Sequence, residues 1–204
     1  DLPSGLLGIG IRNGSVGGNV EQVNLQLINI GRQRTDGIDL RFEHRFEEQA
    51  WGRLTLLVDA TWVNSFERSE SCGGSDSRRG AGPCSGGQRL IERVGEFRYP
   101  EWTANAGLRW VRGDSFARFF ANYVDGYYDD DQRAEVPAER RVGSWTTLNL
   151  TVGRDFGEHQ SMSLGVRNLA DRDPPIALGS ATNVDLYNHN TLGRFWTLDY
   201  VYRF

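Results

Sequence analysis

Apolar and polar side chains alternate with a period of two residues in several segments of this chain. The C-terminal segment RFWTLDYVYRF, residues 194–204, places Trp196, Leu198 and Tyr200 on one side. The segment GIDLRFEHRF, residues 37–46, alternates most regularly and carries four charged side chains on its polar side. A period of two is typical of β-strands whose two faces meet different surroundings. Because charged side chains do not form a dry core, the polar face is expected to meet water.

The same alternation recurs along the chain and predicts about eight strands. No stretch approaches the 18 consecutive apolar residues that a transmembrane helix requires, which excludes a helical membrane anchor. A net charge of −4 gives no indication of nucleic-acid binding. Besides the segment at 38–46, the expected strands are 23–27, 54–66, 102–110, 117–123, 148–152, 162–166 and 196–204.

The connections between the expected strands alternate in length, after a polar turn expected at 31–36. The short connections are 47–52, 112–114 and 157–160, and the long ones are 67–97, 129–140 and 170–191. Antiparallel strands with every long loop at one end are typical of an outer-membrane β-barrel, whose long loops face outside. In this orientation aromatic side chains form two girdles at the membrane interfaces. We expect Trp62, Phe66, Trp102, Trp145 and Trp196 at the outer interface, and Trp51, Trp110, Phe116, Phe156 and Phe204 at the inner one.

Five motifs in fixed order resemble a known family. They are RTDGIDL (34–40), YPEW (99–102), GSWTTLNL (143–150), GVRNLADRDPP (165–175) and LDYVYRF (198–204). Over roughly residues 20–204, the chain resembles the C-terminal part of a TonB-dependent outer-membrane receptor. The resemblance implies an all-β fold: a transmembrane antiparallel β-barrel, of which about eight C-terminal strands of about 22 are present.

The resemblance also implies the function. Such receptors are not enzymes but importers of scarce nutrients, such as siderophores, cobalamin or oligosaccharides, with energy supplied by TonB. The implied location is the bacterial outer membrane, crossed many times, and no cofactor is implied. The implied partners are outer-membrane lipid and lipopolysaccharide, the TonB–ExbB–ExbD complex through the missing plug domain, and the barrel-assembly machinery through the C-terminal strand ending at Phe204. No nucleic acid is expected.

The domain organisation follows from the same resemblance. Residues 1–204 are expected to form the C-terminal segment of the receptor barrel, without the plug domain and the earlier strands. The chain begins at Asp1 with neither Met nor a signal peptide, so we expect a fragment or a processed form. Two alternatives stay open: a self-contained eight-stranded outer-membrane barrel, serving as an anchor or a small enzyme, and a soluble β-sandwich binding module.

Cys72 and Cys84 lie in the longest expected loop, separated by Gly, Ser and charged residues. We expect a disulfide between them, because the intervening residues close easily and an outer loop meets an oxidising environment. The alternatives are two free thiols or half of a metal site, but two cysteines without a nearby His make a poor zinc site. Nearby basic side chains offer a possible anion site: Arg78, Arg79, Arg89 and Arg93.

The remaining polar candidates do not define a catalytic or metal site. Asp129 begins a run of three Asp that reads either as a calcium site or as a solvated acidic loop, and the second reading is favoured because no EF-hand spacing is present. His189 lies near Asp185, a pairing used in general-base catalysis. No Ser or Cys nucleophile stands at a recognisable spacing from this pair. We therefore assign no catalytic residue and no metal ligand, and the ligand-binding residues stay unknown.

Overall fold

The computed structural model describes residues 11–12, 20–22, 31–72, 81–85, 87–129 and 140–204. The chain divides into two units, Asp1–Gly31 and Arg32–Phe204. In the first unit, β1 (Ile11–Arg12) pairs antiparallel with β2 (Val20–Gln22). The strand expected at 23–27 lies outside the described residues. In the described part of the chain, no helix is long and apolar enough to cross a bilayer.

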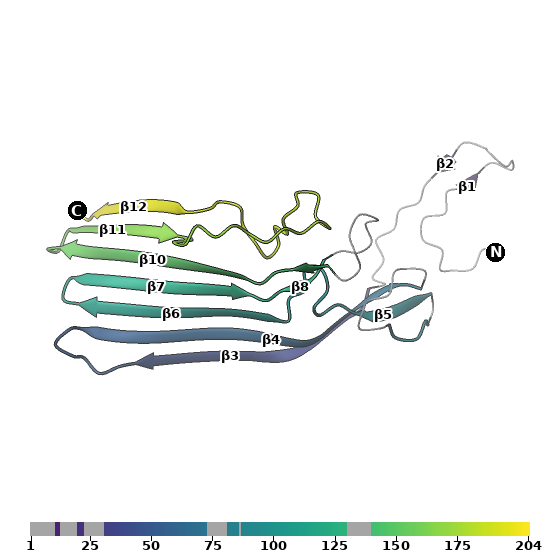
Figure 1. Cartoon of the computed structure of the whole chain (residues 1–204), viewed down its shortest axis with the longest axis horizontal. Helices are drawn as coiled ribbons and strands as arrows, with labels where there is room; N and C mark the ends of the chain where they lie inside the picture. Colours follow the sequence, from purple (N-terminus) through teal and green to yellow (C-terminus); the bar gives the residue numbers. More distant parts are fainter. Residues whose placement is uncertain (1–10, 13–19, 23–30, 73–80, 86, 130–139) are drawn as a thin grey trace. The chain divides into compact units, whose positions relative to one another are not determined.

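The second unit contains an eight-stranded antiparallel sheet in which sequential long strands lie side by side (Figure 1). Its order is β12-β11-β10-β7-β6-β4-β3, and β5 pairs with β4 beyond this path. β3 and β12 are therefore the two edges of the sheet. The strands are β3 (Gln33–Arg45), β4 (Arg53–Ser71), β5 (Gln88–Glu92), β6 (Trp102–Arg112), β7 (Ser115–Val124), β10 (Trp145–Phe156), β11 (Gln160–Arg167) and β12 (Phe195–Tyr202).

Two polar segments expected to be irregular belong to strands instead. β3 begins at Gln33, so the turn expected at 31–36 is wrong. β4 continues to Ser71 and pairs with β5, which shortens the loop expected at 67–97. Both extensions are polar on both faces, so hydropathy alternation does not reveal them; backbone pairing across β3, β4 and β5 holds them extended.

The turns and the loops gather at opposite ends of the sheet, as predicted. β6 and β7 are joined by two residues, with Gly113 at φ 53°, the left-handed conformation that glycine adopts readily. The β10–β11 turn likewise has Gly157 at φ 66°. At the other end lie the long connections, and the one after β7 carries a short hairpin of β8 (Tyr127–Tyr128) with β9 (Arg141–Val142).

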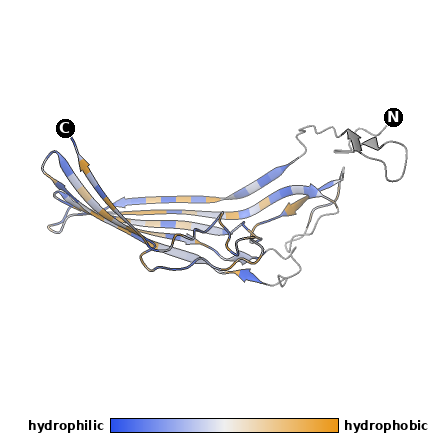
Figure 2. Ribbon diagram, turned by 90° about the horizontal axis from the view of Figure 1, so that it is seen from above, coloured by the Kyte–Doolittle hydropathy of each residue, from blue (hydrophilic) through white to orange (hydrophobic). Residues whose placement is uncertain are grey.

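The strand register gathers apolar side chains on one face of the sheet and polar ones on the other. Leu108 pairs with Phe119, Phe119 with Leu150, Leu150 with Val166, and Val166 with Trp196. One residue along each strand, the row on the opposite face is polar or small. Figure 2 shows the resulting alternation as bands of blue and orange along the strands. The opposite row consists of Arg109, Arg118, Thr151, Gly165 and Thr197.

Register corrects three members of the expected aromatic girdles. Trp62 and Trp102 pair on the apolar face with ring centroids 5.9 Å apart, as the girdle requires. Phe66, Phe116 and Trp145 instead belong to the polar face. For Phe66 the reason is a bulge in the β3–β4 register: Gly37 pairs with Val63 and Asp36 with Ser65, so β4 carries one extra residue and the side chains beyond it turn to the other face.

Phe116 faces inward because it covers a glycine. It pairs with Gly153, and a Cβ added at Gly153 would lie 2.5 Å from the Phe116 ring. Phe120 covers Gly107 on the neighbouring strand in the same way. An aromatic ring over a strand glycine shields backbone that the missing side chain would leave exposed, which stabilises the pair. These rings therefore support the sheet from its polar side.

Candidate functional site

Three long connections meet at the loop end of the sheet. The Tyr128 amide donates a hydrogen bond to the Gly95 carbonyl at 2.8 Å, and the Asn188 side-chain amide donates to the Arg98 carbonyl at 3.2 Å. These bonds join the connections that follow β5, β7 and β11. We call this assembly the loop platform, defined as residues 94–101, 125–129, 140–144 and 168–194. Its small apolar centre consists of Tyr127, Val142 and Ala177, with Phe97 packed against it.

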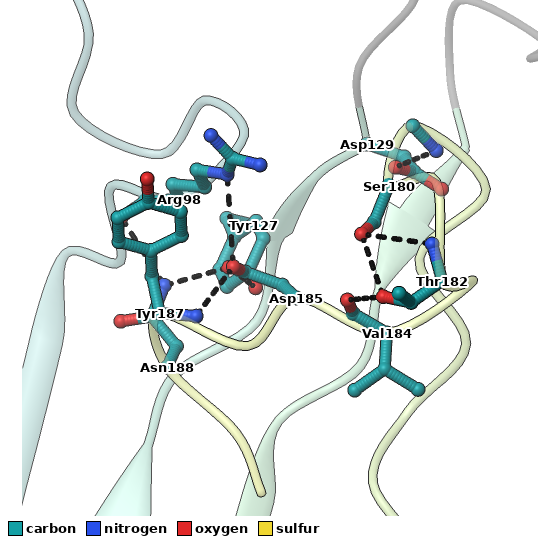
Figure 3. Close-up of polar contacts among 10 residues, drawn as sticks. Arg98, Tyr127, Asp129, Ser180, Thr182, Val184, Asp185, Tyr187 and Asn188 are labelled. Atoms are coloured by element: carbon teal, nitrogen blue, oxygen red, sulfur yellow. Dashed lines mark hydrogen bonds and ion pairs between the residues drawn. The ribbon is translucent and has the colours of Figure 1, made fainter.

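Asp185 is a fully buried carboxylate that binds two of these connections (Figure 3). It accepts hydrogen bonds from the Tyr127 hydroxyl at 2.5 Å, the Tyr187 amide at 3.0 Å and the Asn188 side-chain amide at 2.8 Å. The Arg98 Nε lies 3.7 Å from its Oδ1. Burial and the hydrogen bond to Asp185 raise the pKa of Tyr127, so this hydroxyl remains a donor at physiological pH.

Asp129 is the second buried carboxylate of the loop platform. Its oxygens accept from the amides of Leu178 at 2.8 Å and Gly179 at 3.0 Å, and from Arg140 Nε at 3.0 Å. The solvated acidic loop that was the favoured reading is therefore wrong at Asp129, which is buried, and protein donors occupy the carboxylate that the calcium reading would need. Residues 130–131 lie outside the described residues. Among the described residues, no group of three or more His, Cys, Asp or Glu side chains is placed to hold a metal.

His189 is packed between two aromatic rings rather than paired with a carboxylate. Its ring lies 5.3 Å from that of Trp145 and 6.2 Å from that of Tyr127. Within the described part of the chain, neither imidazole nitrogen has a hydrogen-bond partner. The backbone carbonyl of Asp185 accepts a hydrogen bond from the His189 backbone amide, and the Asp185 carboxylate accepts one from the Tyr127 hydroxyl. The pairing needed for general-base catalysis is therefore not formed.

Burial lowers the pKa of His189, although Asp185 partly opposes the shift. The protonated form of His189 is thus disfavoured in the folded (closed) loop platform. In a locally unfolded (open) platform the imidazole is exposed and its pKa is about 6.5. The closed state is expected to be fully stable above this value and to lose stability as the pH falls from about 6.5 toward the lower pKa of the closed state. Amide exchange of peptides covering 176–190, corrected for its intrinsic pH dependence, should become faster at pH 5 than at pH 8.

A His189→Gln variant provides the control, because it removes this titration and keeps His44 and His159. Its platform exchange should be nearly independent of pH after the same correction. An equal acceleration at low pH in the variant would assign the effect to other groups.

Beside the platform lies a cavity of about 280 Å³ on the polar face of the sheet. Its walls come from β7, β10, β11, β12 and the connection between the last two. Five asparagines line the cavity, together with apolar and small residues, two aromatic rings and one guanidinium, that of Arg167. The residues that carry the amides, with the aromatic residue beneath the platform, are Asn122, Asn149, Asn168, Asn188, Asn190 and Trp145.

The side-chain amides of Asn122 and Asn149, with the backbone amide of Asn168, belong to a hydrogen-bonded row across neighbouring strands. Asn122 donates to the Asn105 side-chain oxygen at 2.5 Å, and Asn149 donates to that of Asn122 at 2.7 Å. The Asn168 backbone amide then donates to the Asn149 side-chain oxygen at 3.0 Å. Each amide nitrogen carries two hydrogens, and the row uses one of them in Asn122 and one in Asn149. The row fixes the amide orientations and leaves a donor on each.

Trp145 joins this cavity instead of the lipid interface for which it was predicted. It is 6% exposed, pairs with Val124, and lies against His189. Its indole Nε1 is buried without a hydrogen-bond partner among the described residues. The sequence did not reveal this role because the platform that covers Trp145 follows it by about 40 residues in the chain.

The structure joins Cys72 and Cys84 in a disulfide at the end of the β4–β5 hairpin, with Cα atoms 5.9 Å apart. The backbone amide of Cys72 donates a hydrogen bond to the Gly87 carbonyl at 3.0 Å. Of the basic residues considered for an anion, Arg93 pairs with Glu70 at 2.5 Å, which compensates its charge. Arg78 and Arg79 lie outside the described residues, and Arg89 lines a cavity of about 400 Å³ with Arg32 and Arg34.

Removing the disulfide is expected to loosen this hairpin end alone. In the chain-entropy model a bridge of this separation contributes about 3 kcal/mol against opening. In the double variant Cys72→Ser, Cys84→Ser, the backbone amides at positions 72 and 88 should therefore exchange about a hundredfold faster. Amides of the β10–β11 pair serve as the internal reference. Unchanged exchange at the hairpin end would contradict a stabilising role for the bridge.

Together, the antiparallel order, the two contrasting faces and the loops gathered at one end define a wall of an outer-membrane-type β-barrel. A family model described as "TonB dependent receptor-like, beta-barrel" matches residues 8–169. The chain belongs to this family of TonB-dependent receptor-like β-barrels.

A search of solved structures finds a likeness to the siderophore receptor PiuA from Acinetobacter baumannii. The two share 16% sequence identity with a TM-score of 0.48, over 85% of this chain and 22% of that one. The chain thus spans less than a quarter of the length of this neighbour. Among curated proteins, no sequence matches the chain.

Proposed function

We propose that residues 1–204 form the C-terminal segment of the barrel of an active-transport receptor in the bacterial outer membrane. The receptor imports a scarce nutrient with energy delivered through TonB. The plug domain and the earlier strands then belong to the rest of the receptor, outside these residues. The family match over residues 8–169 supports this proposal.

The observation that carries the proposal is the separation of the two faces of the sheet. Rows of apolar side chains cross β6, β7, β10, β11 and β12 on one face, and Asn, Thr and Arg cross the same strands on the other. Such a sheet suits a wall with lipid outside and a wet lumen inside. The edges β3 and β12 suit a segment whose neighbouring strands come from the rest of a larger barrel, because an open edge leaves backbone groups unpaired.

The partners follow from the same placement. The apolar face meets membrane lipid, and the outer loops meet lipopolysaccharide. The TonB–ExbB–ExbD complex acts through the plug domain. The barrel-assembly machinery engages the C-terminal strand, whose terminal Phe204 is fully exposed and stacks edge-on with Tyr202 at 5.0 Å. The nutrient belongs to the siderophore, cobalamin or oligosaccharide class.

Uptake by cells tests the proposal. The gene that encodes this chain is deleted, and accumulation of labelled ferric siderophore, cobalamin and oligosaccharides is compared in deleted, complemented and TonB-deficient cells. One nutrient should accumulate only when both the receptor and TonB are present. Equal accumulation of every nutrient in all three strains would contradict the proposal.

Two simpler measurements separate the alternatives. A mature protein of about 23 kDa, the mass of this chain, would favour a self-contained eight-stranded barrel, whereas a receptor should be several times heavier. Extraction without detergent would favour a soluble β-sandwich module, because a barrel wall with an apolar outer face needs detergent.

A further inference from the structure

We infer that two arginines on the apolar face of the sheet, Arg112 and Arg154, bind the phosphate of an anionic phospholipid together with Ser115. The occupant is a membrane lipid at the turn end of the sheet, and not the transported nutrient. The inference rests on the proposed function in one respect, which is that the apolar face meets membrane lipid.

Strand register places the three side chains in one row. β6, β7 and β10 are neighbours in the sheet (Figure 1). Ser115 of β7 pairs with Arg112 on one side and with Arg154 on the other, so all three side chains project from the same face. Neighbouring strands lie about 4.8 Å apart, so the two arginine Cα atoms are roughly 10 Å apart. Arginine side chains that start at this separation are long enough to meet at one phosphate above Ser115.

This row belongs to the apolar face. It continues from Arg154 through Met162 to Tyr200. The next row on this face, two residues nearer the loops, has a tryptophan and aliphatic side chains in all five strands. Its members are Trp110, Ala117, Val152, Leu164 and Leu198. Two cationic side chains therefore project from a face whose other strand residues at this level are apolar or aromatic.

Neither guanidinium is neutralised within the described part of the chain. Arg112 and Arg154 are both exposed, and no carboxylate of a described residue forms an ion pair with either one. The acidic residues close to them in sequence are Asp114, in the β6–β7 turn, and Asp155, which pairs with Ser161 on the opposite face. Two positive charges are thus left for a ligand to compensate.

The depth of the row matches that of lipid headgroups. β6 runs from Trp102, predicted at the outer interface, to Arg112. At about 3.3 Å per residue and a tilt of about 40°, this strand spans roughly 25 Å across the membrane, the height of the apolar band in such barrels. Arginine on the lipid face is tolerated at the end of this band and costly at its middle. Aromatic rings of the kind that gather at headgroup level flank the row, and Arg154 Cζ lies 5.8 Å from the ring centroid of Phe156.

The chemistry of the row favours the phosphate of one class of lipid. Arginine presents a planar fork of N–H donors that matches phosphate oxygens, and the serine hydroxyl adds a further donor. Short turns of outer-membrane barrels lie on the periplasmic side, so the partner is a phospholipid of that leaflet rather than lipopolysaccharide. Phosphatidylglycerol is favoured over phosphatidylethanolamine, because the ammonium group of the latter compensates its own phosphate.

Lipid binding to the intact receptor tests the inference. The purified receptor in a neutral detergent is titrated separately with phosphatidylglycerol, phosphatidylethanolamine and inorganic phosphate, and native mass spectrometry counts the bound molecules. The wild type should bind phosphatidylglycerol in preference to both other probes. Equal binding of the two phospholipids, or inorganic phosphate that binds as tightly as phosphatidylglycerol, would overturn the inference.

Paired substitutions locate the site. Arg112→Gln with Arg154→Gln should weaken phosphatidylglycerol binding about thirtyfold, because each basic residue beside an anionic lipid contributes a factor of about five. Lysine at both positions keeps the charge without the fork and should weaken binding less. The matched control is Arg109→Gln with Arg118→Gln, which removes two exposed arginines that pair on the polar face, and it should bind normally. Unchanged affinity in the first double variant, or an equal loss in the control, would overturn the inference.

The two proposals fail in different ways. TonB-dependent uptake, with lipid binding unchanged by Arg112→Gln and Arg154→Gln, would remove the lipid site and leave the transport function. Lipid binding that this double variant weakens, without uptake that depends on TonB, would leave the lipid site and remove the transport function.

Discussion

Replacing Asp185 with alanine is expected to open the loop platform while the sheet beneath it stays folded. The substitution leaves the buried Tyr127 hydroxyl, the Tyr187 amide and the Asn188 side-chain amide without their common acceptor. Unmade buried hydrogen bonds and the lost partner of Arg98 together cost on the order of 3–5 kcal/mol. Because the loops contribute little to pairing among the long strands, this cost falls on the platform.

Hydrogen exchange of the intact receptor measures this effect. Peptides covering 185–190 should exchange at least a hundredfold faster in Asp185→Ala, with β10 and β11 unchanged. Asp185→Asn, which keeps one acceptor oxygen, should be intermediate. Asp173→Ala removes an exposed carboxylate of the same connection and should behave like the wild type. Retained protection at 185–190 in Asp185→Ala would mean that Asp185 does not hold the platform.

Replacing Asp129 with alanine is expected to release a different part of the same connection. The amides of Leu178 and Gly179 lose their acceptor, and Arg140 loses its ionic partner. Asp129 is 1% exposed, so water does not readily replace these bonds, and the expected cost is about 3 kcal/mol. Peptides covering 176–181 should therefore exchange about a hundredfold faster.

The location of the change distinguishes this variant from the first. Peptides at 185–190 should keep more protection than they do in Asp185→Ala, because their own acceptor is intact. Asp155→Ala, an exposed carboxylate at the turn end, is the matched control. Uniform loss of protection over the whole connection in both variants would show that the two carboxylates act as one cooperative unit, contrary to this prediction.

Period-two alternation was sufficient to predict the long strands, because each face of this sheet keeps one character from strand to strand. The predictions at 102–110 and 117–123 fall within β6 and β7, joined by the expected tight turn. The position of the β6–β7 turn also determines which residues of the two strands pair near the cavity. With Arg112 paired to Ser115, register places Asn105 opposite Asn122, the first bond of the amide row. Counting back from the turn would have revealed this pair.

The loop platform was beyond prediction from sequence, because its contacts join residues far apart in the chain. Asp129 and Asp185 occur in polar segments where composition indicates solvent exposure, yet both are buried, with partners 50 and 58 residues away in the chain. Trp145 was misplaced for the same reason, since the aromatic partner His189 comes from a later connection. The local hydropathy pattern predicts which face of the sheet a strand residue occupies. It does not predict which residues of a distant loop pack against that residue.

Quenching of site-specific fluorophores by nitroxide-labelled lipids tests most directly whether one face of this sheet meets the membrane. Single cysteines are introduced into the intact receptor after Cys72→Ser and Cys84→Ser, at Phe119 and Leu164 on the apolar face and at Arg118 and Ser163 on the polar face. Fluorophores at 119 and 164 should be quenched by nitroxide lipids, and those at 118 and 163 should not. Equal quenching of the two sets by nitroxide lipids, or none at 119 and 164, would contradict a barrel wall with lipid on one side and the lumen on the other.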